Sequence, residues 1–80
     1  MISPLELNRI FATNVRKILS ECKITEKALA ESVGMSVPVF YGKLNSAKNN
    51  DVHHKFNIAE IQAICKELDE SIDDMLEVKE

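Results

Sequence analysis

The side chains most suited to binding a partner lie in the middle of the chain, on both sides of Gly34. Most are hydroxyl, amide or ammonium groups that donate hydrogen bonds or carry positive charge, and two are valines. The candidate binding residues are Thr25, Lys27, Ser36, Val37, Val39, Tyr41, Lys43, Asn45 and Lys48. Donors and cations of this kind bind anionic groups such as phosphates, whereas valine methyl groups contact apolar surfaces.

Charge is distributed unevenly along the chain, whose formal net charge is −3. Residues 1–33 hold five basic and four acidic residues, and residues 34–57 hold three lysines and one aspartate, with His53 and His54 beside them. Residues 58–80 hold two lysines and eight acidic residues. Since a phosphate-binding surface depends on local charge more than on the total, the middle of the chain remains suited to an anionic partner.

Catalytic and metal chemistry find no support in the residue pattern. The chain has two glycines and no glycine-rich phosphate loop, and no serine, cysteine or histidine lies in a recognisable nucleophile setting. The His53-His54 pair fits no standard zinc spacing. Cys22 and Cys65 fall in helical patterns, which predicts small buried apolar side chains in a reduced compartment. We therefore predict no enzymatic activity, no metal and no cofactor.

Length and composition favour one globular domain spanning residues 1–80. The chain has 80 residues, of which 45% are hydrophobic and 29% charged, as in ordinary globular proteins. Two glycines and two prolines are too few for a many-turned β-fold. A signal peptide and an apolar stretch of about 18 residues are both absent, which predicts a cytoplasmic protein with no membrane contact.

Apolar residues recur at intervals of three and four in five segments, which predicts an all-α fold. The expected helices span about 4–22, 26–33, 37–45, 58–68 and 72–77. The expected N-cap residues are Ser3, Thr25, Asn57 and Ser71, with Glu6 and Glu60 completing capping boxes. On the first helix, Arg9, Arg16, Lys17 and Glu21 fall opposite the apolar stripe. Residues 46–57 are polar without a period and are predicted to form a loop, which Val52 and Phe56 attach to the core.

The segment around Gly34 predicts a helix-turn-helix over about residues 25–45. Gly34 adopts the left-handed backbone that stops a helix, and the small Ala30, four residues earlier, allows two helices to approach closely. Met35 is expected to pack beneath the turn. In a helix-turn-helix the second helix enters the major groove of DNA, although many other helical hairpins also turn at a glycine.

Residues 24–36, ITEKALAESVGMS, resemble the helix-turn-helix of the Cro and lambda-repressor (XRE-type) family, whose pattern is roughly l-s-q-e-e-L-A-e-k-l-G-v-s. Leu29-Ala30 and Gly34 fall on its most characteristic positions. Residues 61–76 resemble the fourth and fifth helices of that family, so the resemblance covers about residues 7–77. It implies a compact five-helix lambda-repressor-like DNA-binding domain, commonly a homodimer on a palindromic operator, of a phage or bacterial transcriptional regulator.

The motif departs from the family pattern at four positions. Glu26 replaces a glutamine that often contacts phosphate, Val37 and Pro38 replace polar readers, and Gly42 replaces another frequent contact residue. Asn45 matches a position that often contacts phosphate.

Two hypotheses follow from these departures. In the first, the protein is a repressor-like regulator of double-stranded DNA, in which Val37 and Val39 contact thymine methyl groups and the polar candidates bind phosphates or base edges. In the second, the fold is kept as an antirepressor or adaptor whose apolar surface binds a protein partner. A homodimer would associate through apolar residues near the C-terminus, namely Ile72, Met75, Leu76 and Val78.

Overall fold

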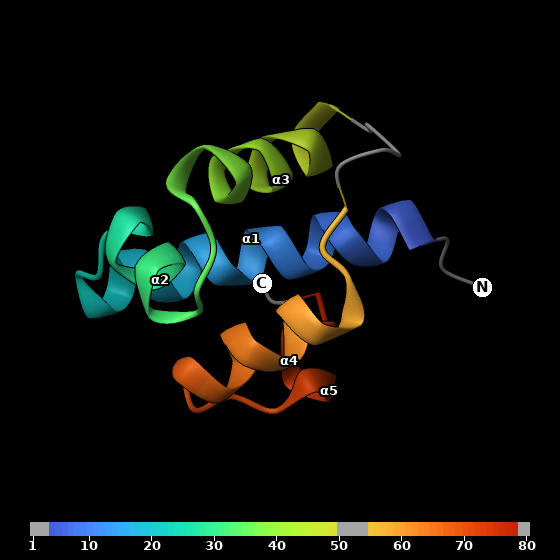
Figure 1. The fold of residues 1–80 in the computed structure, drawn as a ribbon. Coiled ribbons are helices and arrows are strands. Elements are labelled where there is room, and N and C mark those ends of the chain that lie inside the picture. The colour runs from blue at the N-terminus through green and yellow to red at the C-terminus, as the bar shows by residue number, and fades with distance from the viewer. Residues whose placement is uncertain (1–3, 50–54, 79–80) are drawn as a thin grey trace.

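The computed structural model describes residues 4–49 and 55–78, and side chains within 6–45 and 55–78. Over that part of the chain five helices and no strands are present: α1 (Pro4–Cys22), α2 (Glu26–Ser32), α3 (Val37–Asn49), α4 (Ile58–Glu67) and α5 (Ile72–Met75). Helix α1 lies between α3 on one side and the α4–α5 pair on the other (Figure 1). The predicted all-helical, five-helix class is confirmed. None of the described helices is long and apolar enough to cross a membrane.

The core forms where the apolar stripe of α1 meets α3. Phe11 and Val15 of α1 and Phe40 and Leu44 of α3 are all fully buried. Phe56, which precedes α4, inserts between the two helices, with ring centroids 5.4 Å from Phe11 and 5.9 Å from Phe40 in edge-on geometry. Each such side chain stabilises the fold by about 1.5–3 kcal/mol through burial alone. The predicted attachment of the loop by Phe56 is therefore confirmed.

The turn between α2 and α3 follows the sequence prediction. Thr25 caps α2 by accepting a hydrogen bond from the Ala28 amide at 3.0 Å. Gly34 adopts φ +77°, and a Cβ built there meets nothing within 4 Å, so its backbone conformation, not lack of space, favours glycine. The Met35 amide then donates to the Ala30 carbonyl at 2.9 Å, which closes the turn. Met35 packs against the core as expected.

Four helix ends differ from the sequence prediction, although α2 and α4 each end only one residue before the predicted position, at Ser32 and Glu67. Helix α3 extends to Asn49, four residues beyond the predicted end, because residues 46–49 contain no glycine or proline to stop it and include the good helix formers alanine and lysine. Helix α5 ends at Met75 and continues as a turn whose Glu77 amide donates to the Asp74 carbonyl. The predicted N-caps Asn57 and Ser71 are confirmed, the former as a full capping box. The expectations for Ser3, Val52, His53 and His54 lie outside the described residues.

A buried amide of α1 holds the C-terminal end of the fold in place. Asn14 is 4% exposed, and its Nδ2 donates to the Met75 carbonyl at 2.7 Å and to the Glu77 carbonyl at 2.8 Å. The last carbonyls of a helix have no partner within the helix. Asn14 therefore satisfies the carbonyl of the last residue of α5 and that of Glu77 just beyond it, and it joins α1 to the C-terminal segment.

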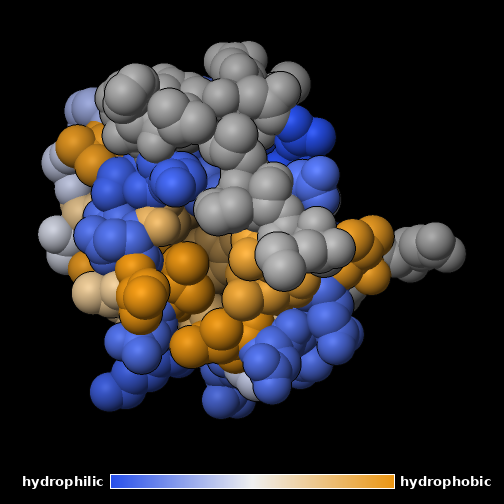
Figure 2. All heavy atoms as spheres, turned by 90° about the vertical axis from the view of Figure 1, so that its right-hand side faces the viewer, coloured by the Kyte–Doolittle hydropathy of each residue, from blue (hydrophilic) through white to orange (hydrophobic). Residues whose placement is uncertain are grey.

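An apolar groove of about 460 Å³ lies on the side where α1 begins. Its lining includes Leu7, Phe56, Ile58, Ile61 and Leu76. Figure 2 shows the apolar surface gathered on this face of the molecule. Ile58 is 74% exposed, which is unusual for so large an apolar side chain.

The two cysteines occupy different environments. Cys65 is buried, as predicted, and its burial, together with the nearby Glu70 charge, raises the pKa of the Cys65 thiol. The prediction that Cys22 is buried is wrong, because Cys22 is the last residue of α1 and its side chain is exposed.

The substitution Asn14→Ala is expected to lower the free energy of unfolding by roughly 2 kcal/mol, because it leaves two carbonyls without their buried donor. Urea unfolding followed by circular dichroism measures this change. Ser20→Ala, at an exposed position of the same helix, is the matched control and should shift stability by no more than about 0.5 kcal/mol. Equal midpoints for Asn14→Ala and the unsubstituted protein would contradict the role assigned to this amide.

A thiol reagent at neutral pH is expected to modify one cysteine rapidly in the folded protein and two in urea. The thiolate is the reactive form, so burial and a raised pKa both slow the reaction of Cys65. Cys22→Ser should abolish the fast phase, whereas Cys65→Ser should keep it. Two fast thiols in the folded protein would be inconsistent with the packing of α4.

Candidate nucleic-acid interface

Helix α3 has one face in the core and one face on the surface. Phe40 and Leu44 are fully buried, whereas Val39 is 48% exposed and Tyr41 is 42% exposed. Asn45, one turn beyond Tyr41, is also exposed. In Figure 1 this helix forms one outer edge of the molecule. The exposed face of α3 is therefore available to a large partner.

Two capping hydroxyl groups lie at the helix starts of the motif. The Thr25 hydroxyl accepts from the Ala28 amide, and the Ser36 hydroxyl accepts from the Val39 amide at 3.4 Å. Both residues are exposed. A hydroxyl that accepts through a lone pair keeps its O–H hydrogen, which it donates to another acceptor. Each N-terminus thus combines a hydroxyl donor with the positive end of a helix dipole, which favours anions.

Lys43 forms an ion pair with Glu60 of helix α4. Its Nζ lies 2.5 Å and 2.6 Å from the two carboxylate oxygens of Glu60, and both side chains are less than one-fifth exposed. Glu60 also accepts from the Asn57 amide at 2.9 Å in the capping box of α4. The ammonium group of Lys43 therefore joins α3 to the start of α4, and most of its charge is neutralised locally.

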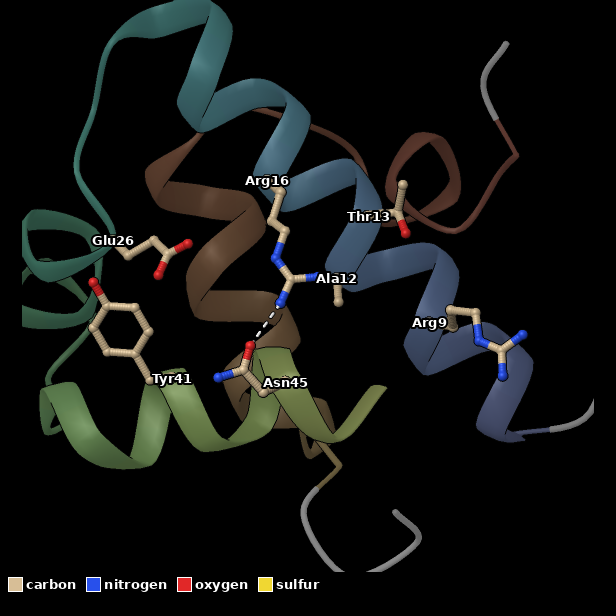
Figure 3. A pocket seen from close by; sticks show the side chains of 7 residues that line it. All are labelled: Arg9, Ala12, Thr13, Arg16, Glu26, Tyr41 and Asn45. Carbon is tan, nitrogen blue, oxygen red and sulfur yellow. Dashed lines mark hydrogen bonds between the residues drawn. The ribbon is translucent and has the colours of Figure 1, made fainter. Parts of the chain in front are cut away.

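A groove of about 750 Å³ separates the polar side of α1 from the exposed face of α3 (Figure 3). It is lined by Arg9, Ala12, Thr13 and Arg16 of α1, Glu26 of α2, and Tyr41 and Asn45 of α3. Nη2 of Arg16 donates to Oδ1 of Asn45 at 3.1 Å across this groove. Because that bond occupies the amide oxygen, Asn45 presents its Nδ2 as a donor, and a donor binds phosphate.

The carboxylate of Glu26 lies on the wall of the same groove, near the hydroxyl end of Tyr41 (Figure 3). Glu26 is the first residue of α2, where an acidic side chain stabilises the helix through its dipole. Its side chain is only half-exposed. The acidic residue at this position thus has a structural reason, although its charge opposes an approaching phosphate.

The predicted binding residues differ in how far their side chains are exposed. The exposed members of the set are Thr25, Lys27, Ser36, Val39, Tyr41 and Asn45. Val37 is half-buried and packs against the core, and Lys43 is half-buried in its ion pair. Lys48 belongs to α3, but its side chain lies outside the described residues.

Sequence reasoning left out the α1 wall of the groove. The spacing of Arg9, Thr13 and Arg16 by four and three residues places them on one helical face, which the sequence alone reveals. It does not reveal that α3 lies beside this face.

Comparison with protein-family models gives one match. The model of the Cro/C1-type HTH DNA-binding domain matches residues 14–80, which include the second half of α1 and all of α2 to α5. Comparisons with curated proteins and with solved structures find no match to this chain.

Proposed function

Because the chain belongs to the Cro/C1-type helix-turn-helix DNA-binding domain family, we propose that it is a repressor-like transcriptional regulator that reads the major groove with α3. Membership of this family implies DNA binding, and our proposal adds the role of that binding in the control of transcription. The observation that carries the proposal is the two-sided packing of α3. Its core face is fully buried through Phe40 and Leu44, while Val39, Tyr41 and Asn45 face outward.

The proposed contacts divide into phosphate and base contacts. Nδ2 of Asn45 and the hydroxyl groups of Ser36 and Thr25 are donors suited to phosphate oxygens, and the exposed Lys27 adds a mobile cation. Val39 is suited to a thymine methyl group. Few side chains on α3 read base edges by paired hydrogen bonds, so part of the specificity is expected to come from DNA shape.

The test is a gel-shift titration at a stated salt concentration with random and upstream DNA fragments. Asn45→Ala is expected to weaken binding about fivefold, as for the loss of one hydrogen bond to a phosphate. Lys43→Ala is expected to weaken binding and also to lower the unfolding free energy, because it removes the bond between α3 and α4. Lys66→Ala, which removes an equal charge from an exposed site on α4, is the control with unchanged affinity.

Unchanged affinity in both Asn45→Ala and Lys43→Ala would contradict the proposed binding face. Failure of the unsubstituted protein to retard any DNA at micromolar concentration and low salt would instead favour the antirepressor or adaptor function.

We further propose that the regulator acts as a homodimer through the apolar groove of Leu7, Phe56, Ile58, Ile61 and Leu76. Large exposed apolar patches mark interaction surfaces, and a second copy is the occupant that a two-fold symmetric operator requires. The groove revises the sequence-based choice of dimer residues. Met75 is fully buried, so it contributes to the core and not to a dimer contact, whereas Val78 is 72% exposed.

The substitution Ile58→Glu is expected to shift the protein toward monomer in sedimentation equilibrium, since it places a charge in the centre of the contact. Ile24→Glu is the matched control, because Ile24 is 38% exposed but does not line the groove. A monomeric mass for the unsubstituted protein at high concentration would contradict the homodimer.

A further inference from the structure

The apolar groove where α1 begins contains one buried polar side chain with an unused donor. Asn8 lines this groove and is 6% exposed. Its Oδ1 accepts a hydrogen bond from the Phe56 amide at 3.2 Å, which fixes the orientation of the side-chain amide. Its Nδ2 is buried and has no hydrogen-bond partner among the described residues. Since buried amide donors are nearly always paired in folded proteins, this donor indicates an acceptor supplied by a molecule that binds in the groove.

The charge of the groove lining differs from that of the whole chain. Lys55 belongs to the lining at an exposed position. None of the described residues in the lining is acidic, although the chain holds 13 acidic residues and has a net charge of −3. A lining that combines an ammonium group and an amide donor without a carboxylate favours an anionic group.

The walls of the groove are suited to an apolar chain. They consist of Leu7, Phe56, Ile58, Ile61 and Leu76. Figure 2 shows the apolar surface of this face with hydrophilic residues around it. The groove volume of about 460 Å³ lies within the range of pockets that bind small organic molecules, roughly 300–1,000 Å³. Such pockets combine apolar walls with a few polar groups that orient the ligand.

We propose that the apolar groove binds an aliphatic monocarboxylate of medium chain length. The chain of this ligand lies against the apolar walls, and its carboxylate accepts from Nδ2 of Asn8 and pairs with the ammonium group of Lys55. A carboxylate has two oxygens and about four lone-pair sites, so one head group satisfies both donors.

Such a ligand competes with the second copy of the chain that we assign to the same groove. A two-fold contact places the same surface on both sides of the interface. It therefore joins two linings that hold donors and no described carboxylate, so Asn8 and Lys55 gain no acidic partner from each other's surroundings. Because burial of unpaired polar groups is unfavourable, a carboxylate that satisfies both donors displaces the second copy. This regulatory consequence rests on the proposed homodimer, whereas the ligand site does not.

The first test uses decanoate below its micelle concentration, with decanol as an uncharged molecule of the same chain length. In ¹H–¹⁵N NMR titrations, decanoate is expected to shift the side-chain amide signal of Asn8. Lys55→Gln is expected to weaken decanoate binding about threefold and to leave decanol binding unchanged. Lys66→Gln, which removes an exposed cation of α4 outside the lining, is the control with unchanged affinity for both.

The second test exchanges the donor of Asn8 for an acceptor. Asn8→Asp keeps the oxygen that accepts from the Phe56 amide and replaces Nδ2 by a second oxygen. It is expected to weaken decanoate binding at neutral pH at least about tenfold, because the donor is lost and the new charge repels the head group. Asn45→Asp makes the same exchange at an exposed site outside this groove and should leave the affinity within about twofold. Circular dichroism verifies that each variant is folded.

The outcomes separate the ligand site from the homodimer. Equal affinity for decanoate and decanol, or decanoate affinity that neither Lys55→Gln nor Asn8→Asp alters, would overturn the head-group contacts and the proposed ligand class. If decanoate does not bind while Ile58→Glu still dissociates the dimer, the groove is a dimer contact alone and the ligand site is wrong. If decanoate binds a protein that is monomeric at every concentration, the ligand site stands and the homodimer is wrong. If both proposals hold, decanoate lowers the mass in sedimentation equilibrium toward that of the monomer.

Discussion

The packing of α3 onto the apolar stripe of α1 is the constraint on which the remaining structure depends. Phe11 and Val15 of α1 and Phe40 and Leu44 of α3 form the buried contact. Phe56, which precedes α4, fills the space between the two helices. A chain of 80 residues buries a small core, so it has few alternative ways to satisfy these side chains. Once α3 is docked by this face, its opposite face must lie on the surface. The exposure that a DNA-binding helix needs is thus a consequence of the core.

Helix α1 packs against α5 on one side and against α3 on the other, and each contact requires different residue types. Toward α5 it provides Asn14, whose amide satisfies the carbonyls of Met75 and Glu77. Toward α3 it provides Ala12, which is 1% exposed, beside the longer polar residues that line the groove. A small residue allows close approach, and the arginines beside it define a rim. Helix α1 therefore contributes to the core on one face and to the lining of the groove on an adjacent face.

Local signals in the sequence predict the observed structure, whereas features that depend on distant neighbours cannot be predicted from it. Thr25, Gly34 and Asn57 act within one helical turn, so their residue types predict the observed caps and turn. The polarity of residues 46–49 predicts a loop, but nothing in them stops a helix, and α3 continues to Asn49.

The environment of Cys22 and the role of Asn14 depend on tertiary packing. Periodicity places Cys22 on the apolar stripe of α1, but it does not show that the core ends before that residue. Nor does a single asparagine in a helix reveal that two carbonyls about sixty positions later are its partners. The groove between α1 and α3 was missed for the same reason, because an exposed arginine has the same pattern whichever helix it faces.

An acidic protein that binds DNA must separate its charges, and this fold does so along the chain. Of the described acidic residues of positions 58–78, Glu60 pairs with α3, and the others belong to the end of α4, the turn after it, α5 and the residue Glu77, on the opposite side of α1 from α3 (Figure 1). Glu60, at the start of α4, lies next to α3, and Lys43 neutralises it. The Lys43–Glu60 pair therefore has an electrostatic consequence beyond joining two helices: it keeps the negative surface of α4 from extending to α3. The donors exposed on α2 and α3 are thus kept apart from most of the acidic residues, so the local charge around them differs from the net charge of −3.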